Sequence, residues 1–463
     1  MSERTKYILF FFCVLASRIP FLFDGYGLDG DAWSVGITAD HIRSSLTYEA
    51  SRLPGNPVHE MLCALFVGGG YWRLNLLSAV FGSFGVLFFV MTLRALRFRM
   101  SFLAGAALAA VPVLFISSTV ALDYVFGFAF LMAALYAVSC DRSLIAGILL
   151  GLAIGCRVTS GAMLLPYALL LLQNDGLTRS LWRIFNCLSA ALLIGALCYA
   201  PSYLVYGKEF FTYYEVPYPS IPRVLYRGFV EVWGVVGFVG LVTAVISLLL
   251  PERFFTANYQ FPRSVNIKYV VAWLVALDLY IIAFIKLPME AGYLLPALPF
   301  ILMILGKYLV RPVYGAFCWT LIISSMFVSV SPAERPDAVK LSPAHMAVEI
   351  AGESLNVDFL KGPVWAYQSR RVSGMEYAKG LLSSFDSLEV PSAVVAGQWY
   401  NMLIELNGDT IRRNTIIASH VTEADLHRFL VERRSIYFLP RQDSFNIQIK
   451  HADPKLFGGE LYD

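Results

Sequence analysis

Long apolar stretches separated by short polar loops occupy the first 330 residues of the chain. A helix needs about 20 apolar residues to cross the ~30 Å hydrocarbon core of a bilayer. By this rule the sequence predicts eleven transmembrane segments, at 7–23, 73–93, 101–118, 121–139, 143–156, 159–173, 184–205, 229–250, 269–286, 292–309 and 313–330. The fifth and sixth are short and can form a hairpin that crosses only part of the bilayer, because neighbouring helices would bury its ends.

The basic residues of the short loops predict how the segments are oriented. With the N-terminus inside, every inner loop carries Lys or Arg: Arg94, Arg97, Arg99, Arg142, Arg179, Arg183, Arg253, Arg263, Lys268, Lys307 and Arg311. The long loop 24–72 and everything after residue 331 then lie outside. Several arginines also fall on the outer side, and an anionic ligand is one reason for such exceptions to the charge rule: Arg18, Arg43, Arg52, Arg157, Arg223 and Arg227.

Composition agrees with a membrane protein and excludes several other classes. Of the 463 residues, 57% are hydrophobic and 15% are charged, whereas about a quarter of the residues of ordinary globular domains are charged. The net charge of +3 is too small to indicate a nucleic-acid partner. All seven cysteines precede residue 331, mostly within apolar stretches, which is typical of buried cysteines rather than of a disulfide framework or a metal site.

Residues 331–463 are polar and predict a second domain. Short β-type runs alternate with helical patterns, at Val364–Tyr367, Ala393–Ala396, Thr415–Ala418 and Ser435–Leu439. The clearest helix covers 423–433, where Thr422 can cap the N-terminus with Asp425 three positions on. This alternation indicates a small extracytoplasmic α/β domain that follows a transmembrane domain at 1–330. It contains neither GxGxxG nor GxxxxGK[ST], so nucleotide binding has no support.

The first outer loop holds three carboxylates in eight residues, Asp24, Asp29 and Asp31, among glycines that let the backbone turn. Two amphipathic segments follow, at 34–46 and 57–70. Carboxylates and arginines at a lipid surface suit transfer of a sugar from a polyprenyl phosphate. The departing phosphate is already a stable anion, so the reaction needs a base for the acceptor hydroxyl and cations for the phosphate. The alternative for these three aspartates is that they belong to a solvated loop or cap the helix that begins near Trp33.

Three motifs, in order along residues 1–330, resemble the GT-C superfamily of membrane glycosyltransferases, which includes the protein O-mannosyltransferases and the lipid A aminoarabinose transferases. The first is Arg18-Ile-Pro20 before Asp29-Gly-Asp31, with a later Pro54-Gly-Asn-Pro57. The second is Leu122-Asp123-Tyr124, followed by a glycine-rich run from Gly147 to Arg157. The third is Tyr293-Leu-Leu-Pro296 after Glu290. Two departures are Arg157, where the family usually has Lys, and Gly292, where it has Arg.

The resemblance implies an α-helical GT-C-type membrane domain with an outward-facing cavity, in which Asp31 or Asp29 is the catalytic base and Asp123 a second acidic residue. The candidate substrate-binding residues are Arg18, Arg52, His59, Arg157, Lys286, Glu290 and Tyr293. Each has a structural alternative: Asp123 can cap a helix, Arg157 can form a salt bridge, Arg52 and His59 can contact lipid headgroups, and Glu290 can cap the next helix.

The sequence therefore predicts an inverting hexosyl- or pentosyltransferase with a polyprenyl-phosphate sugar as donor and a lipid, glycan or protein as acceptor. We expect no obligatory cofactor, although the two carboxylates of Asp29 and Asp31 could bind Mg²⁺ or Mn²⁺ weakly. We expect a multi-pass protein of a bacterial inner membrane. Two rival functions stay open: a transporter or flippase of lipid-linked glycans, and a membrane anchor whose polar tail binds other envelope proteins.

Overall fold

The computed structural model describes residues 2–172, 176–212, 217–249, 265, 267–332, 342–350, 353–386, 388–408, 414–439 and 455–456. Arg253 and Arg263, which the charge rule places in an inner loop, lie outside these residues. The helices of the first 330 residues are α1 (Glu3–Ala16), α2 (Gly30–Ser45), α3 (Pro57–Phe66), α4 (Tyr71–Ala95), α5 (Ser101–Ala110), α6 (Pro112–Ser117), α7 (Tyr124–Ser139), α8 (Ser143–Cys156), α9 (Leu164–Leu171), α10 (Leu177–Tyr206), α11 (Ile221–Leu225), α12 (Val232–Ser247), α13 (Ile267–Lys286), α14 (Leu298–Tyr308) and α15 (Arg311–Ser324).

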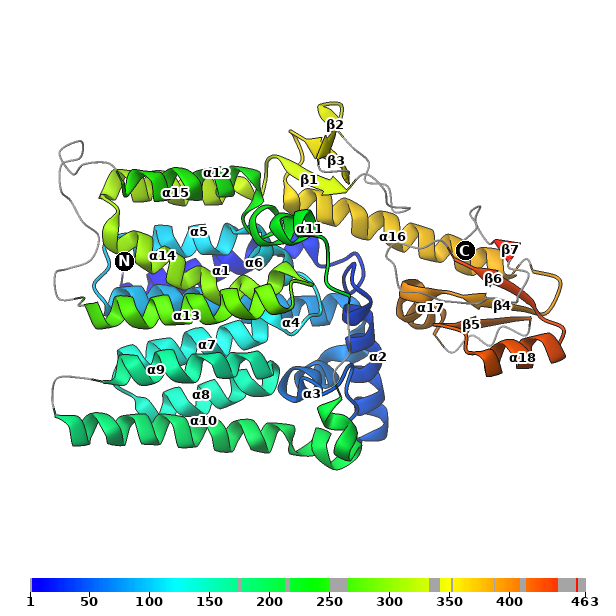
Figure 1. Cartoon of the computed structure of the whole chain (residues 1–463), viewed down its shortest axis with the longest axis horizontal. Helices are drawn as coiled ribbons and strands as arrows, with labels where there is room; N and C mark the ends of the chain where they lie inside the picture. Colours follow the sequence, from blue (N-terminus) through cyan, green and yellow to red (C-terminus); the bar gives the residue numbers. More distant parts are fainter. Residues whose placement is uncertain are drawn as a thin grey trace.

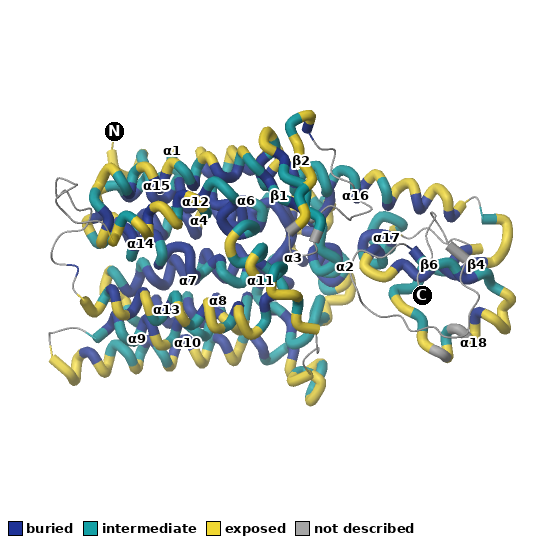
Figure 2. The backbone as a smooth tube through the Cα atoms, turned by 45° about the horizontal axis from the view of Figure 1, so that its top comes forward, coloured by how far each residue is buried: buried dark blue, intermediate teal, exposed yellow. Residues whose placement is uncertain are grey.

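Most of these helices run side by side in a bundle, and α2 lies across its end (Figure 1). Helix α7 is central: it packs against α4 and α8, and nearly all of its residues are buried. The outer helix α10 exposes Leu192, Leu193 and Leu197, and the exposed residues lie mainly on the outside of the bundle (Figure 2). An interior of packed apolar residues with leucines on the outer surface is what a lipid environment favours.

Close packing of α8 against α10 explains the glycine-rich run. A Cβ atom on Gly147 would come within 2.3 Å of the Cys187 carbonyl oxygen, and one on Gly151 within 2.6 Å of Ile194. Small residues at this spacing let two membrane helices approach closely. The glycines therefore position α8, and Arg157 is the residue directly after its C-terminus.

Each of the eleven predicted segments contains helix, so the positions of the apolar elements are confirmed. Five helical stretches are long and apolar enough to span a bilayer: Tyr71–Ala95, Leu177–Phe211, Ile221–Ser247, Ile267–Lys286 and Ala291–Tyr308. The others are shorter, and the third predicted segment is divided at Val111, before Pro112. The chain is a multi-pass membrane protein, while the count of eleven crossings stays a prediction.

Two small sheets follow the bundle. Strands β1 (Ser329–Pro332), β2 (His345–Ile350) and β3 (Glu353–Asp358) form an antiparallel sheet in the order β1-β3-β2. Strands β4 (Ser392–Val395), β5 (Thr415–Ala418), β6 (Ser435–Phe438) and β7 (Lys455–Leu456) form a parallel sheet in the order β5-β4-β6-β7. Helices α16 (Pro363–Asp386), α17 (Tyr400–Asn407) and α18 (Glu423–Val431) accompany them.

The C-terminal predictions from local sequence are partly right. Strands β4, β5 and β6 and the capping box at Thr422 and Asp425 are confirmed. The predicted β-run Val364–Tyr367 is wrong, because these residues form the first turn of α16. Pro363 takes the first helical position, where its fixed φ angle favours a helix and its missing N–H costs nothing.

Helix α16 is fastened to the first outer loop by Arg371, which is 1% exposed. Its guanidinium donates to the carbonyl oxygens of Phe21 (2.9 Å), Asp24 (3.1 Å), Gly25 (2.6 Å) and Thr119 (3.2 Å). Gln368 of the same helix also hydrogen-bonds the Asp24 carboxylate. Buried carbonyl groups need donors, so the loop that carries the acidic motif takes its shape partly from the C-terminal segment.

Candidate active site

The carboxylates Asp29 and Asp31 lie at the N-terminus of α2. Asp29 caps the helix, and its side chain accepts the Asp31 backbone N–H at 3.0 Å. Trp33 is buried and donates from Nε1 to the Gly27 carbonyl oxygen at 2.9 Å, which fixes the turn that precedes the helix. The loop is therefore ordered by its own contacts, and Asp31 projects from the first helical turn.

Arg52 connects Asp31 to a second acidic residue, Asp123, with which Arg157 also pairs. Arg52 pairs with the Asp31 carboxylate, and its other nitrogen lies 3.6 Å from Asp123 Oδ1. Arg157 lies 2.5 Å from Asp123 Oδ2. The Asp123 side chain is only 3% exposed and that of Arg157 14%, so these opposite charges neutralise one another in a poorly solvated place. Asp31, Arg52, Asp123 and Arg157 thus form a chain of alternating charge.

Arg52 is held by a turn that Glu60 organises. The Glu60 side chain is fully buried and accepts hydrogen bonds from the Ser51 N–H (2.8 Å), the Asn56 N–H (3.0 Å) and the Tyr48 hydroxyl (2.6 Å). A carboxylate that accepts several hydrogen bonds fixes the groups that donate them. Glu60 therefore fixes residues 48–56, the turn that carries Arg52.

Two tyrosines lie against Arg157. Its guanidinium carbon is 4.1 Å from the ring centroid of Tyr124 and 5.3 Å from that of Tyr293, both within the range of cation–π attraction. The Tyr124 hydroxyl donates to the Glu290 carboxylate. A Cβ atom on Gly292 would come within 2.7 Å of the Tyr124 ring. An arginine side chain at position 292 therefore has no room, and Arg157 supplies the cation next to Tyr293.

Burial and the charge of Asp29 raise the pKa of Glu290 to about 8. Burial and the charge of Asp31 likewise raise the pKa of Asp29. Glu290 is therefore protonated near neutral pH. The site then holds one fewer negative charge where a phosphate has to approach.

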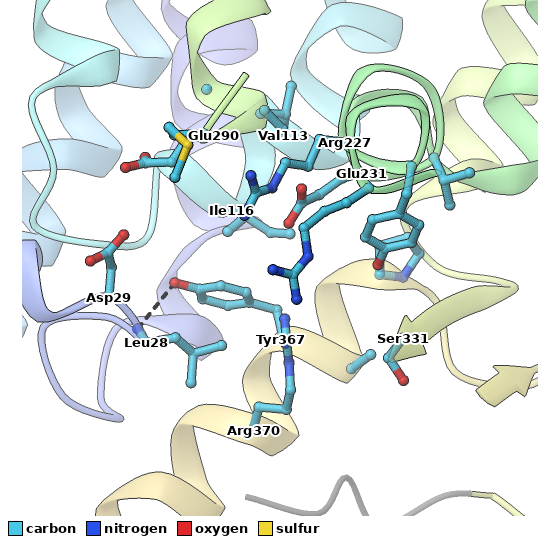
Figure 3. Close-up of a pocket in the computed structure, with 18 of the residues that line it drawn as sticks. Leu28, Asp29, Val113, Ile116, Arg227, Glu231, Glu290, Ser331, Tyr367 and Arg370 are labelled. Atoms are coloured by element: carbon cyan, nitrogen blue, oxygen red, sulfur yellow. Dashed lines mark hydrogen bonds between the residues drawn. The ribbon is translucent and has the colours of Figure 1, made fainter. Parts of the chain in front are cut away.

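A cavity of about 1050 Å³ opens beside these carboxylates. Asp29, Asp31, Tyr124 and Glu290 line it, and Figure 3 shows Asp29 and Glu290 on the same side of it. Its walls come from the ends of the bundle helices, from the N-terminus of α2 and from the C-terminal segment. Polar groups that converge on a large, mostly apolar cavity are typical of a binding site for a small or lipid-like molecule.

Comparison with solved structures gives a match over nearly the whole chain. The crystal structure of ArnT from Cupriavidus metallidurans bound to undecaprenyl phosphate superimposes with a TM-score of 0.50, at 14% sequence identity, over 96% of this chain and 87% of that one. The apo form of the same protein gives 0.48 over the same shares. ArnT is a GT-C lipid A aminoarabinose transferase. The chain has the GT-C fold. Neither the family models nor the curated protein sequences give a match.

Within this GT-C fold, seven of the predicted site residues come together: Asp29, Asp31, Arg52, Asp123, Arg157, Glu290 and Tyr293. These come from four separate parts of the sequence, which the fold brings to the outer end of the bundle. For Arg157 the salt bridge offered as a structural alternative is present, with Asp123 as its partner, while phosphate binding by Arg157 stays a prediction.

Three predicted substrate ligands lie elsewhere. Arg18 is 3% exposed, bonds the Ala109 carbonyl and lies 4.1 Å from the ring centroid of Phe115. His59 is fully buried, with its ring 4.5 Å from that of Phe126, and burial lowers its pKa to about 4. Lys286 is exposed at the end of α13. None of the three lines the cavity, and none of them pairs with Asp31 or Asp123 as Arg52 and Arg157 do. Their role in phosphate binding stays a prediction.

The sequence interpretation missed several residues of the cavity, among them Tyr124, Tyr367 and Arg370, although it had noted Arg223 and Arg227 as outer-side arginines that an anionic ligand could explain. Tyr124 directly follows Asp123 and could have been found from the motif. Arg370 could not, because nothing local to α16 indicates that this helix reaches the first loop.

Asp31 and Asp123 are already paired with arginine. Among the described residues, no group of three or more His, Cys, Asp or Glu side chains is placed to hold a metal ion. A divalent ion at Asp29 and Asp31 would have only two carboxylates, one of which pairs with Arg52 and the other of which caps α2. The donor set thus fits a resident Mg²⁺ or Mn²⁺ ion poorly.

The pKa of Glu290 leads to a pH prediction. We expect the rate of sugar transfer by the wild type to fall as the pH rises through about 8, because Glu290 then gains a negative charge next to Asp29. Glu290→Gln stays neutral and should lose this alkaline limb. Rates measured between about pH 6.5 and 9.5 test this, with the exposed Glu376→Gln as control. Superimposable alkaline limbs in wild type and Glu290→Gln would remove Glu290 from this role.

Proposed function

We propose that the chain is a membrane glycosyltransferase that moves a sugar from a polyprenyl-phosphate donor to an acceptor hydroxyl. The observation that carries the proposal is the ion pair of Asp31 and Arg52 in a GT-C fold, in which Asp31 lines a large cavity. A base and a phosphate-binding cation are the two groups that this reaction requires, and here they are adjacent.

In the proposed step, Asp31 takes the proton of the acceptor hydroxyl as that oxygen attacks the anomeric carbon. The bond from the anomeric carbon to the phosphate oxygen breaks, and its electrons leave with polyprenyl phosphate. Attack from the face opposite the leaving group inverts the configuration. Arg52 holds the departing phosphate with the N–H groups that Asp31 does not use, since a guanidinium binds phosphate through paired donors.

Asp31 suits the role of base better than its neighbours. Asp29 is engaged as the cap of α2, and burial raises its pKa. Asp123 is nearly inaccessible behind two arginines, so we assign it the positioning of Arg52 and Arg157. Asp31 has a 39% exposed side chain and is the carboxylate that an acceptor hydroxyl can reach.

Several finer features belong to the same proposal. The transferred group is a hexose or a pentose, and the acceptor is a lipid, a glycan or a protein. The cavity and the C-terminal segment face the extracytoplasmic side of a bacterial inner membrane, as the basic loops predict. The donor enters from the bilayer, and the acceptor enters from outside.

Purified full-length protein in lipid nanodiscs, supplied with radiolabelled polyprenyl-phosphate sugars and candidate acceptors, tests the reaction. We expect a new glycosidic bond whose anomeric configuration, determined by NMR, is opposite to that of the donor. A flippase would instead move the intact donor across a liposome membrane without forming that bond. Movement without transfer would replace the enzyme by the transporter.

A further inference from the structure

The cavity has a second, basic side that the proposed reaction does not use. Its lining includes Arg223 of α11, Arg227 in the turn after it, and Arg370 of α16, with Glu231 as a nearby acidic residue. Apolar residues line the same cavity: Val113, Ile116, Phe238, Val348, Leu355 and Val357. Arg227 and Arg370 are partly buried there, and a cation in a largely apolar cavity is stabilised by an anionic counterpart.

Arg370 is the most informative of the three. It is half-buried, and its Nε is buried without a hydrogen-bond partner. No carboxylate of the described residues pairs with its guanidinium, whose carbon lies 5.7 Å from the ring centroid of Tyr367. Buried donors in native proteins are nearly always satisfied, so an unsatisfied guanidinium N–H in a cavity points to a ligand that accepts from it.

The surrounding contacts fix where Arg370 lies. The next residue, Arg371, is anchored by four carbonyl oxygens. Three residues before it, the Tyr367 hydroxyl accepts the Leu28 N–H at 3.2 Å, directly before Asp29 (Figure 3). The backbone of Arg370 is thus fixed relative to the carboxylate loop, and a subsite built this way is organised before its ligand arrives.

We propose that Arg370, together with Arg227, forms an anion subsite that binds the phosphate of an amphiphilic substrate, whose hydrocarbon part lies along the apolar wall. Arg227 donates one N–H to the Pro288 carbonyl oxygen at 2.9 Å, which orients its guanidinium and leaves further donors. A planar guanidinium fork matches phosphate oxygens. The inference rests on the proposed function. The phosphate belongs either to the polyprenyl donor or to a phosphorylated acceptor lipid.

Binding to the full-length protein in neutral phosphatidylcholine nanodiscs separates these sources. The probes are polyprenyl phosphate against polyprenol, and a phosphorylated glycolipid against its dephosphorylated form. We expect Arg370→Gln to weaken binding of one phosphorylated probe by about 10- to 100-fold, the usual range for a lost charge-assisted hydrogen bond. Arg370→Lys should lose less, because it keeps the charge. Arg428→Gln, on the exposed face of α18, is the matched control.

Weaker binding of polyprenyl phosphate alone assigns the subsite to the donor, and weaker binding of the glycolipid alone assigns it to the acceptor. The proposal is overturned if Arg370→Gln binds both phosphorylated probes as Arg428→Gln does, or if the uncharged probes lose as much. Because this readout is binding, it is independent of turnover. A protein with Arg370-dependent binding and no transfer activity would sink the glycosyltransferase proposal and keep the subsite.

Discussion

Asp31→Asn lowers the rate of sugar transfer by about 10²- to 10⁴-fold, the usual contribution of a positioned general base. The amide has nearly the shape of the carboxylate and can still accept a hydrogen bond from Arg52, but it cannot take the proton of the acceptor hydroxyl. Single-turnover transfer of a radiolabelled sugar, with donor binding measured in parallel, tests this. We expect the rate to fall while the donor still binds.

Asp40→Asn serves as the control for this experiment, because Asp40 lies on the same helix with an exposed side chain. It should transfer sugar at the wild-type rate. Wild-type transfer by Asp31→Asn would remove Asp31 as the base and shift the assignment to Asp29, which lines the same cavity. The GT-C fold would be unaffected by that outcome.

Asp123→Asn should lower the free energy of unfolding by about 3–5 kcal/mol, the cost of leaving a buried cation without its partner. Both Arg52 and Arg157 lose their shared counter-charge, and Arg157 has little access to water. Adding Arg157→Met to this variant should recover part of the loss. Chemical unfolding in detergent, followed for the wild type, both single variants and the double variant, measures the coupling between the two sites.

Asp141→Asn provides the matched comparison. Asp141 also pairs with an arginine, Arg183, at 2.9 Å, but its side chain is 45% exposed. Exposed ion pairs contribute only about 0–1 kcal/mol. Equal losses in the Asp141 and Asp123 variants would mean that the pair of Asp123 and Arg157 is solvated, contrary to the burial described above.

The apolar pattern of the sequence predicted the helices well, because each segment carries its own signal. The acidic loop was also found from sequence, since Asp29 and Asp31 stand together beside glycines in a region that follows an apolar helix. The individual ion pairs from Asp31 to Arg157 could not be predicted from the sequence. Their residues had nevertheless been selected as candidates, because they are charged and lie on the outer side of the membrane.

The contribution of Arg370 and α16 to the basic side of the cavity could not be predicted, for a physical reason. It depends on contacts such as that of Leu28 with Tyr367, which are 339 positions apart in the sequence. A local sequence pattern cannot indicate a contact between residues so far apart in the chain. The antiparallel sheet of β1, β2 and β3 was missed as well; its first strand, β1, begins within the last predicted apolar segment, 313–330. At Val364–Tyr367 a strand was predicted that does not exist. The local β-propensity of these residues is outweighed by the long helix α16 to which they belong.

The bonds of Arg371 to the first loop also set the order in which a newly made chain acquires its site. The carbonyl of Asp24 precedes its guanidinium partner by 347 positions, and translation adds about 5–20 residues per second. The ribosome therefore makes the acidic loop some tens of seconds before that guanidinium, and it completes the helical bundle, which ends at Ser324, only about 2–9 seconds before it. During that interval the nascent protein resides in the bilayer with its acidic loop unfastened, and maturation is a post-insertion event.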